Sequence, residues 1–222
     1  MVKYDEIAGM IDHSLLKPFL TDKDIIDGCS LADQYKVASV CVRPCDVKLA
    51  AELLKESPVL VTTVIGFPHG STTTRCKLEE SKEAIENGAM ELDVVLNIGK
   101  LKSKKYDEVL LDLKPVIDYA HSRHVKVKVI FENCYLKVDE IIKACQLCNE
   151  LSVDWVKTST GYGTGGAMIN DIKVMRKNVH PSVQIKAAGG IRTLEKVLKM
   201  RELGCTRIGA TATKEILDAI RN

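Results

Sequence analysis

Eight short β-branched runs, separated by helix-like segments, recur along the whole 222-residue chain. One apolar residue marks each run, and consecutive markers lie 23 to 35 residues apart: Ile11, Val40, Val64, Val94, Val129, Val156, Ile185 and Ile208. Strands that alternate with helices at this interval pair in parallel through helical crossovers. Eight such units predict an α/β fold: a closed (β/α)8 TIM barrel with a short N-terminal helix, in a single domain over residues 1–222.

The segments between the runs have helical signatures. Thr21–Lys36 begins with a threonine followed three residues later by an aspartate, and Lys102–Arg123 is amphipathic, with Pro115 expected to kink it. Val138–Leu151 and Thr193–Leu203 also have helical patterns, and a glycine closes the second of them. An open doubly wound sheet is the alternative, but no G-x-G-x-x-G follows the first strand to support its dinucleotide-binding form.

Composition and charge exclude several classes of protein. Hydrophobic residues make up 45% of the chain and charged residues 28%, which is typical of a globular protein and not of a disordered one. The 32 basic and 30 acidic side chains leave a net charge of +2, so nucleic acid and membrane surfaces are not expected partners. No apolar run approaches the roughly 20 residues of a membrane span, and the acidic amino end does not fit a secretory signal. We therefore expect a cytoplasmic protein.

The eight cysteines do not require disulfides in a chain of this length. Cys145 and Cys148 form a C-x-x-C inside a predicted helix, but no second ligand pair follows at the spacing of a zinc site, and the five histidines are scattered. A metal or redox site is therefore less favoured than reduced, mostly buried thiols.

Alternation within the strands predicts which side chains face the inside of the barrel. In residues 91–97 and 125–132, one face is apolar and the other is mixed. The mixed positions are Glu91, Asp93, Val95, Asn97, Lys126, Lys128, Ile130 and Glu132. The apolar faces should contact the helices, and the mixed faces should point inward together with Asp12, Cys41, Lys157 and Lys186. Charged groups would then converge near the carboxyl ends of the strands, where barrel enzymes have their active sites.

Two lysines stand at the ends of predicted strands. Lys157 follows VDWV and precedes TSTG, and Lys186 ends VQIK before AAGG. A lysine after an apolar strand is partly desolvated, which lowers its pKa and frees an amine that can attack a carbonyl. For one such lysine, a solvent-exposed amine or a simple ion pair is the favoured interpretation. Two lysines on one face beside Asp93 favour catalysis, because their repulsion helps one of them to lose its proton.

Other polar residues at the predicted mouth have weaker signals. Asp93 could neutralise a lysine or shuttle a proton, and a purely structural ion pair is equally consistent with its position. Asp12 and Lys128 are second-tier candidates, which could orient the reacting groups or be structural partners. Cys41 could meet reactive aldehydes, although a core thiol is favoured. His69, in GFPHG, is expected in a turn rather than in a catalytic role.

Small residues gather after three late strands, in residues 161–166, 188–192 and 209–211. Glycine lets backbone N–H groups approach an anion, and helix amino ends favour negative charge. Loops after the seventh and eighth strands are a recurrent phosphate site in these barrels. The pattern therefore predicts that the ligand carries a phosphate group.

These stretches resemble the deoxyribose-phosphate aldolases, a class I aldolase family. The similar segments are IDHSLLKP, SVCVRP, VIGFPHG, ELDVVLNIGKLKS, VIFENCYL, VKTSTGYGTGGA, IKAAGGIR and TRIGAT, in order across nearly the whole chain. The resemblance implies a barrel that reversibly cleaves 2-deoxy-D-ribose 5-phosphate to acetaldehyde and D-glyceraldehyde 3-phosphate, in deoxyribose phosphate catabolism. It implies no metal and no organic cofactor, sugar phosphates and aldehydes as small-molecule partners, and leaves a homo-oligomer open.

Matched residue by residue, the resemblance also implies roles. Lys157 would carry the Schiff base, and Asp93 and Lys186 would donate and accept protons. The phosphate would be bound by Gly161, Gly189, Gly190, Ile191, Arg192, Gly209 and Thr211. The chain departs from the family in GATAT, where many relatives carry serines. Thr211 keeps a hydroxyl and Ala212 does not, which bears on phosphate affinity rather than on the aldol chemistry.

Two rival functions stay open at this stage. One is a metal-dependent aldolase or another phosphate-binding barrel enzyme, which chelator sensitivity would reveal. The other is a non-catalytic protein that binds sugar phosphates, which the presence of both lysines and Asp93 disfavours.

Overall fold

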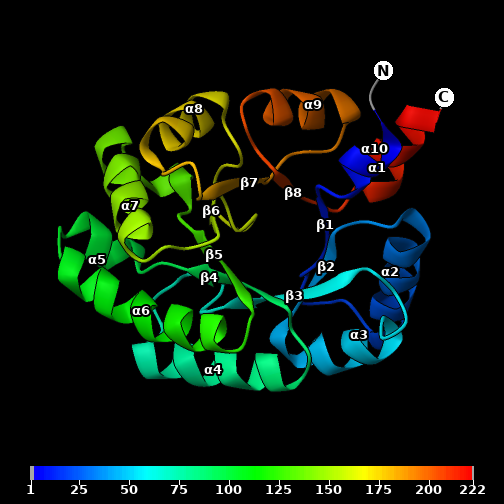
Figure 1. Cartoon of the computed structure of the whole chain (residues 1–222), viewed down its shortest axis with the longest axis horizontal. Coiled ribbons are helices and arrows are strands. Elements are labelled where there is room, and N and C mark those ends of the chain that lie inside the picture. Colours follow the sequence, from blue (N-terminus) through cyan, green and yellow to red (C-terminus); the bar gives the residue numbers. More distant parts are fainter. Residues whose placement is uncertain (1–2, 222) are drawn as a thin grey trace.

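The computed structural model describes residues 3–221, in which eight parallel strands close into a barrel in the order β1 to β8. The strands are β1 (Ile11–Leu15), β2 (Ser39–Val42), β3 (Leu60–Ile65), β4 (Glu91–Val95), β5 (Lys126–Ile130), β6 (Trp155–Lys157), β7 (Gln184–Ala188) and β8 (Arg207–Ala210). Pairing of β1 with both β2 and β8 closes the ring, which Figure 1 shows end-on. The predicted (β/α)8 barrel is confirmed, and the alternative of an open sheet is wrong.

Helices surround the barrel on its outer side (Figure 1). They are α1 (Tyr4–Ala8), α2 (Asp22–Tyr35), α3 (Val47–Leu53), α4 (Thr74–Glu86), α5 (Ile98–Lys102), α6 (Tyr106–Ser122), α7 (Val138–Glu150), α8 (Ile169–Asn178), α9 (Leu194–Glu202) and α10 (Thr213–Arg221). Short 3-10 turns occupy Pro44–Asp46 and Asn133–Tyr135. The predicted short N-terminal helix is α1. Among the helices of residues 3–221, none is long and apolar enough to cross a membrane.

Local sequence explains where helices begin and end. Thr21 caps α2, because its hydroxyl accepts the Asp24 N–H while the Asp24 carboxylate accepts the Thr21 N–H at 2.7 Å. One prediction was wrong: the segment Lys102–Arg123 is not a single helix. Lys104 has a φ of 58° and separates α5 from α6, since that conformation cannot continue a right-handed helix. Pro115 lies inside α6, which continues on both sides of it.

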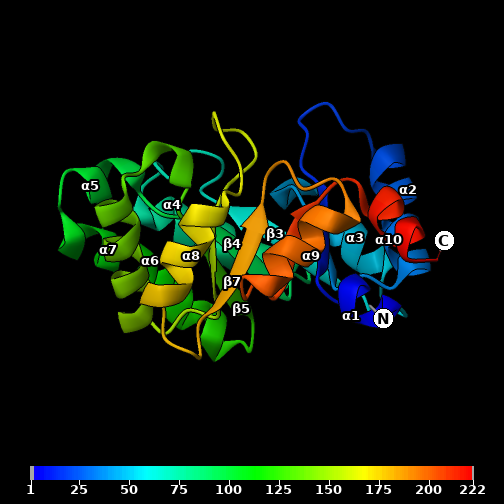
Figure 2. The same ribbon diagram turned by 90° about the horizontal axis from the view of Figure 1, so that it is seen from above.

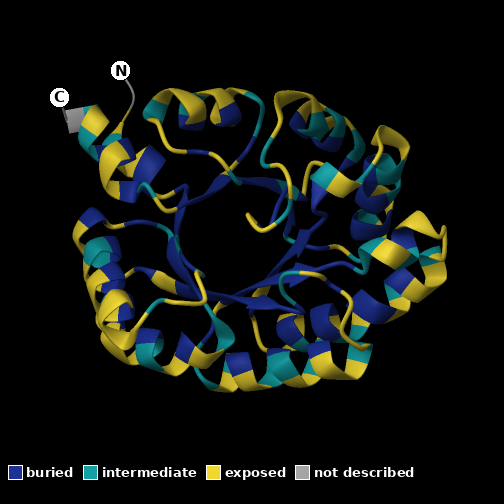
Figure 3. Ribbon diagram, turned by 180° about the vertical axis from the view of Figure 1, so that it is seen from behind, coloured by how far each residue is buried: buried dark blue, intermediate teal, exposed yellow. Residues whose placement is uncertain are grey.

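The main hydrophobic core lies between the strands and the helices. It contains Leu92 and Val94 of β4, as the strand alternation predicted, whereas Val95 is buried outside this cluster. Figure 3 shows the buried ring of strands and the exposed outer faces of the helices. Lys126 is an exception to the predicted inward set. It begins β5 at the amino end of the barrel, where its side chain is half exposed and pairs with Asp154.

The two ends of the barrel differ. Figure 2 shows the blue loop between β1 and α2 and the yellow loop after β6 projecting from one side, with α1 on the opposite side. Both loops follow the carboxyl ends of their strands, so they mark the mouth of the barrel. Residues that end the strands are thereby delivered to this mouth.

Candidate active site

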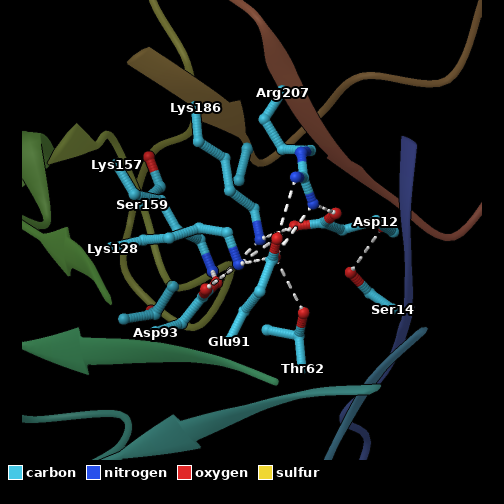
Figure 4. Close-up of polar contacts among 12 residues, drawn as sticks. Asp12, Ser14, Thr62, Glu91, Asp93, Lys128, Lys157, Ser159, Lys186 and Arg207 are labelled. Carbon is cyan, nitrogen blue, oxygen red and sulfur yellow. Dashed lines mark hydrogen bonds and ion pairs between the residues drawn. The ribbon is translucent and has the colours of Figure 1, made fainter. Parts of the chain in front are cut away.

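Strand register brings the predicted catalytic residues together inside the barrel. Lys157 lies opposite Lys186 in the pairing of β6 with β7, and Asp93 lies opposite Lys128 in the pairing of β4 with β5. Asp93 Oδ2 accepts from Lys157 Nζ at 2.6 Å and from Lys186 Nζ at 2.7 Å. Its Oδ1 accepts from Lys128 Nζ at 2.8 Å. Asp93 is therefore a single acceptor shared by three lysines (Figure 4).

Asp12, on β1, forms the second acidic centre of this cluster. Its Oδ2 accepts from Lys186 Nζ and lies 3.6 Å from Lys128 Nζ, and its Oδ1 accepts from Ser39 Oγ at 2.7 Å. The two second-tier candidates Asp12 and Lys128 are thus in direct contact with the residues predicted to be catalytic, and both are fully buried.

Glu91 and Arg207 extend the cluster, although sequence reasoning gave neither residue a role. Arg207 donates to the two Glu91 carboxylate oxygens at 2.9 Å each, and to Asp12 Oδ1 at 2.6 Å. Lys128 Nζ lies 2.5 Å from Glu91 Oε2. Both residues occupy inward positions of their strands, so the same alternation that located Asp93 could have found them.

Lys157 ends β6 as predicted, but β7 continues for two residues beyond Lys186, so the prediction that Lys186 ends its strand is wrong. The two lysines differ in their affinity for a proton. Burial is the largest influence on Lys157 and lowers the pKa of its amine, and the Lys186 ammonium lowers it further against the opposing effect of Asp93. Burial also acts to lower the pKa of Lys186, but the carboxylates of Asp12 and Asp93 outweigh it and raise that pKa above the ordinary value. Lys157 is therefore the lysine that more readily supplies a free amine.

Near neutral pH, Asp93 and Asp12 are ionised, whereas the thiol of Cys41 keeps its proton. Burial alone would raise the pKa of Asp93, but the surrounding lysines hold it well below the ordinary value. The pKa of Asp12 is lowered in the same way, against the effect of burial. Burial raises the pKa of Cys41 to about 11. Asp93 and Asp12 are therefore carboxylates, and Cys41 is a protonated, buried thiol.

A cavity of about 180 Å³ connects Lys157 with the glycine-rich loops. All seven predicted phosphate residues line it: Gly161, Gly189, Gly190, Ile191, Arg192, Gly209 and Thr211. Three further lining residues, Tyr162, Ala188 and Ala210, lie within the predicted loop segments, and four were not predicted: Ser14, Leu16, Lys17 and Thr160. Lys17 could have been noticed in IDHSLLKP as a cation that follows the first strand.

Side-chain hydrogen bonds hold the loop after β6 in place. Thr158 Oγ1 donates to the Ala188 carbonyl at 3.1 Å and accepts from the Ala188 N–H at 3.1 Å, which ties this loop to β7. The Glu132 carboxylate accepts from the Thr160 N–H at 3.2 Å and from the Thr160 hydroxyl. The threonines of VKTSTG therefore position Gly161, which follows them directly.

The glycine-rich loops that line this cavity, residues 161–166, 188–192 and 209–211, form what we call the rim. Glycine is required where these loops meet. Gly189 and Gly190 have φ values of 88° and 76°, which favour glycine. A Cβ on Gly166 would lie 2.3 Å from the Gly189 carbonyl oxygen, so the two loops approach through their backbones. Helices α9 and α10 begin two residues after Arg192 and Thr211, respectively. Backbone N–H groups and helix amino ends suit this part of the cavity to an anion.

Several other residues that the sequence analysis considered lie elsewhere. His69 is exposed and lines a neighbouring cavity with Tyr162 and Glu132, outside the cavity of Lys157. Cys145 and Cys148 are buried in α7, and burial raises the pKa of Cys145 to about 12. Within residues 3–221, no three His, Cys, Asp or Glu side chains are grouped so that they could hold a metal ion.

Comparison with known proteins agrees with this geometry. The chain is 51% identical over 219 residues to the deoxyribose-phosphate aldolase of Thermococcus gammatolerans, covering 98% of this chain and 97% of the relative. It is 48% identical over 219 residues to the deoxyribose-phosphate aldolase of Rhodopirellula baltica, covering 99% and 91%. The tetrameric structure of deoxyribose phosphate aldolase from Aeropyrum pernix superposes with a TM-score of 0.92 at 27% identity, covering 99% of this chain and 93% of that chain.

The family model described as DeoC/LacD family aldolase matches residues 7–213, from α1 to the start of α10. This match includes the strands that carry the lysine cluster and the loops that line its cavity. The chain therefore belongs to the DeoC/LacD family of aldolases.

Proposed function

We propose that this protein is a class I aldolase that reversibly cleaves 2-deoxy-D-ribose 5-phosphate to acetaldehyde and D-glyceraldehyde 3-phosphate, in deoxyribose phosphate catabolism. It acts as a single barrel domain over residues 1–222. The observation that carries the proposal is a buried lysine of lowered pKa, Lys157, which contacts Asp93 and lines a cavity shared with glycine-rich loops.

Cleavage begins at the Lys157 amine. It attacks the aldehyde carbon of the open-chain sugar, and the resulting carbinolamine loses water to give an iminium. The surrounding charges favour this role, because burial and Lys186 both make the Lys157 ammonium less stable. The iminium is an electron sink for the bond that breaks next.

Proton transfer then accompanies breakage of the carbon–carbon bond. Removal of the proton from the C3 hydroxyl breaks the C2–C3 bond, releases D-glyceraldehyde 3-phosphate and leaves an enamine on Lys157. Protonation of the enamine carbon and addition of water release acetaldehyde and restore the amine. At rest Lys186 holds a proton and Asp93 is a carboxylate, so Lys186 donates and Asp93 accepts in this relay. Acid–base catalysis of this kind contributes about 10²–10⁴ in rate.

The glycine-rich rim binds the phosphate away from the reacting bond. Backbone N–H groups at Gly189 and Gly190, together with the cation of Arg192, suit a phosphate and position the sugar for attack. Binding energy from this remote group can be used in the transition state, since it holds the aldehyde carbon against the Lys157 amine.

Borohydride reduction in the presence of acetaldehyde tests the Schiff-base role. We expect peptide mapping to find the two-carbon adduct on Lys157. A stable adduct on another lysine, with Lys157 unmodified, would overturn this assignment. A sample without acetaldehyde is the control, since borohydride alone forms no adduct.

Treatment with a chelator separates this proposal from a metal-dependent aldolase. We expect turnover to survive exhaustive chelation, because the proposed electron sink is the iminium on Lys157. Loss of turnover that a divalent metal restores would favour the rival mechanism. We further propose a cytoplasmic location, and the tetrameric relative makes a homo-oligomer the assembly to test first.

A further inference from the structure

We propose that Glu91 and Arg207 are positioning residues that set the charge balance around the Lys157 amine, although neither lines its cavity. The inference rests on the proposed role of Lys157 as the amine that forms the Schiff base. It assigns a purpose to two buried charges that the reaction itself does not use.

A continuous chain of contacts connects the pair to Lys157. Arg207 binds both oxygens of Glu91 and also Asp12 Oδ1, while Asp12 Oδ2 accepts from Lys186. Lys186 and Lys157 then share Asp93 Oδ2 at 2.7 and 2.6 Å. Figure 4 shows these side chains converging from different strands.

Neighbouring side chains hold the pair in one arrangement. The Arg207 guanidinium carbon lies 4.9 Å from the centre of the Trp155 ring, in a cation–π contact. On the other side of the pair, Thr62 Oγ1 donates to Glu91 Oε2 at 3.1 Å. Glu91 and Arg207 are both buried, so solvent and salt screen their charges weakly.

The buried charges in contact around Lys157 balance only when Lys157 is neutral. Among the residues that the structure describes, this cluster holds three carboxylates and three cations besides Lys157: Asp12, Glu91, Asp93, Lys128, Lys186 and Arg207. Cys41 of β2 also lies beside them, but burial keeps its thiol protonated, and β3 contributes Thr62, which does not titrate. Lys17 and Arg192 line the same cavity as Lys157, but both are exposed, so solvent screens their charges. Protonation of Lys157 therefore adds an uncompensated positive charge to a buried cluster.

This balance predicts that two substitutions shift the pKa of Lys157 in opposite directions. Glu91→Gln removes a negative charge, so the Lys157 ammonium becomes less stable and its proton leaves at lower pH. Arg207→Met removes a positive charge, so the ammonium becomes more stable and keeps its proton to higher pH. A purely structural role for the pair predicts no such reversal of sign, because both substitutions would only loosen the same contacts.

Competitive labelling of the full-length protein with trace acetic anhydride over a pH series tests the proposal. Only the free amine reacts, so peptide mass spectrometry of the Lys157 peptide gives a midpoint pH without reliance on turnover. We expect the midpoint to fall by about one unit in Glu91→Gln and to rise by about one unit in Arg207→Met. The double variant removes one charge of each sign, and its midpoint should return to that of the wild type.

Two further variants distinguish an effect of the Arg207 charge from an effect of the contacts that Arg207 makes. Arg207→Lys keeps the charge and loses the two-oxygen contact, so its midpoint should match the wild type, whereas a scaffold role would make it resemble Arg207→Met. Asp112→Asn breaks the buried pair of Lys77 with Asp112, which joins α4 and α6 outside the barrel. This control should leave the Lys157 midpoint unchanged.

Each outcome has a definite meaning. Equal midpoints in folded wild type, Glu91→Gln and Arg207→Met would overturn the inference, as would shifts in the same direction. If Arg207→Met does not fold, the other two variants decide the question. The Lys157 midpoint should fall in Glu91→Gln and should return to the wild-type value in the double variant. Absence of an acetaldehyde adduct on wild-type Lys157 would instead overturn the proposed function, because acetylation reports the amine whether or not it forms a Schiff base.

Discussion

The lysine cluster inside the barrel and the glycine-rich rim of its mouth border the same cavity but are built in opposite ways. In the cluster, Asp93 is fully buried and holds three lysines within hydrogen-bond distance. At the rim, Arg192 is exposed, and Gly189 and Gly190 contribute backbone rather than side chains. In the proposed function, the chemistry of the cluster depends on charge, and recognition of the phosphate by the rim depends on backbone shape.

This difference determines how strongly each site should respond to substitution. Charges in the cluster act on one another through a medium that screens them weakly, so removal of one charge changes the proton affinity of its neighbours. Water and salt screen the rim, and in the proposed site several N–H groups would share the binding of one anion. We therefore expect large effects on catalysis from the cluster and smaller, substrate-dependent effects from the rim.

A buried lysine outside the barrel sharpens the comparison. Lys77 of α4 donates to the Val95 carbonyl at 2.9 Å, and its amine lies 2.5 Å from Asp112 of α6. Burial lowers its pKa, as it does for Lys157. Lys77 lines none of the cavities described above, whereas Lys157 lines the cavity of the rim. Burial and a lowered pKa therefore do not identify a reactive lysine without access to a substrate.

The largest effect is expected for Lys186→Leu, with cleavage reduced by about 10²–10⁴ while the fold is kept. The substitution removes the proposed proton donor and also the positive charge that lowers the pKa of Lys157. Asp12 keeps Arg207 as a partner, so no buried carboxylate is left unpaired. Steady-state cleavage over a pH series, with circular dichroism as the control for folding, measures the loss.

The pH series also separates the two roles of Lys186. Loss of the Lys186 charge moves the acidic limb of the rate profile to higher pH. Acetaldehyde should therefore still be trapped on Lys157, slowly, when the pH is raised. Lys186→Arg should also be poor, because a guanidinium keeps its proton. A wild-type rate with an unchanged profile would show that Lys186 does not take part.

A smaller and selective effect is expected for Arg192→Met at the rim. A hydrogen bond between a cation and an anion contributes about 1.5–3 kcal/mol, and exposure places Arg192 at the lower end of that range. We expect kcat/KM for the 5-phosphate to fall about tenfold, with 2-deoxyribose unaffected. Equal losses for the two sugars would mean that Arg192 does not select the phosphate.

Much of the fold could be predicted from the sequence because the barrel repeats one local pattern. Each β-branched run became a strand, and α2, α7 and α9 lie within one residue of the expected ends. The error between Lys102 and Arg123 has a physical origin. An amphipathic pattern continues across the break, and the positive φ of Lys104 has no glycine or asparagine to announce it.

The candidate site was predictable where single residues carry the proposed chemistry. Lys157 ends β6, Asp93 and Lys186 lie in the middle of β4 and β7, and all three stand in distinctive motifs; the structure places them in contact. Glu91 and Arg207 were missed as partners because their meaning depends on cross-barrel contacts that join β4 to β8. Alternation indicates that a side chain points inward, but not which charge it meets on the opposite wall.

The smallest effect is expected for Ala212→Ser, which adds a hydroxyl to the rim directly before α10. A hydrogen bond contributes about 0.5–1.5 kcal/mol, and one added donor at a rim that water and salt screen contributes at the lower end of that range, so kcat/KM for the 5-phosphate should rise about two- to threefold, with 2-deoxyribose unchanged. Thr211→Val is the matched control, because Thr211 lines the cavity and valine removes its hydroxyl but keeps the side-chain shape. This substitution should lower kcat/KM for the 5-phosphate by a similar factor. A serine at this position can also cap α10, since the Ala212 carbonyl already accepts the Ile216 N–H at 3.0 Å. A higher melting temperature with an unchanged preference for the phosphorylated sugar would mean that the hydroxyl binds the helix, and Ala212 would then lie outside the phosphate site.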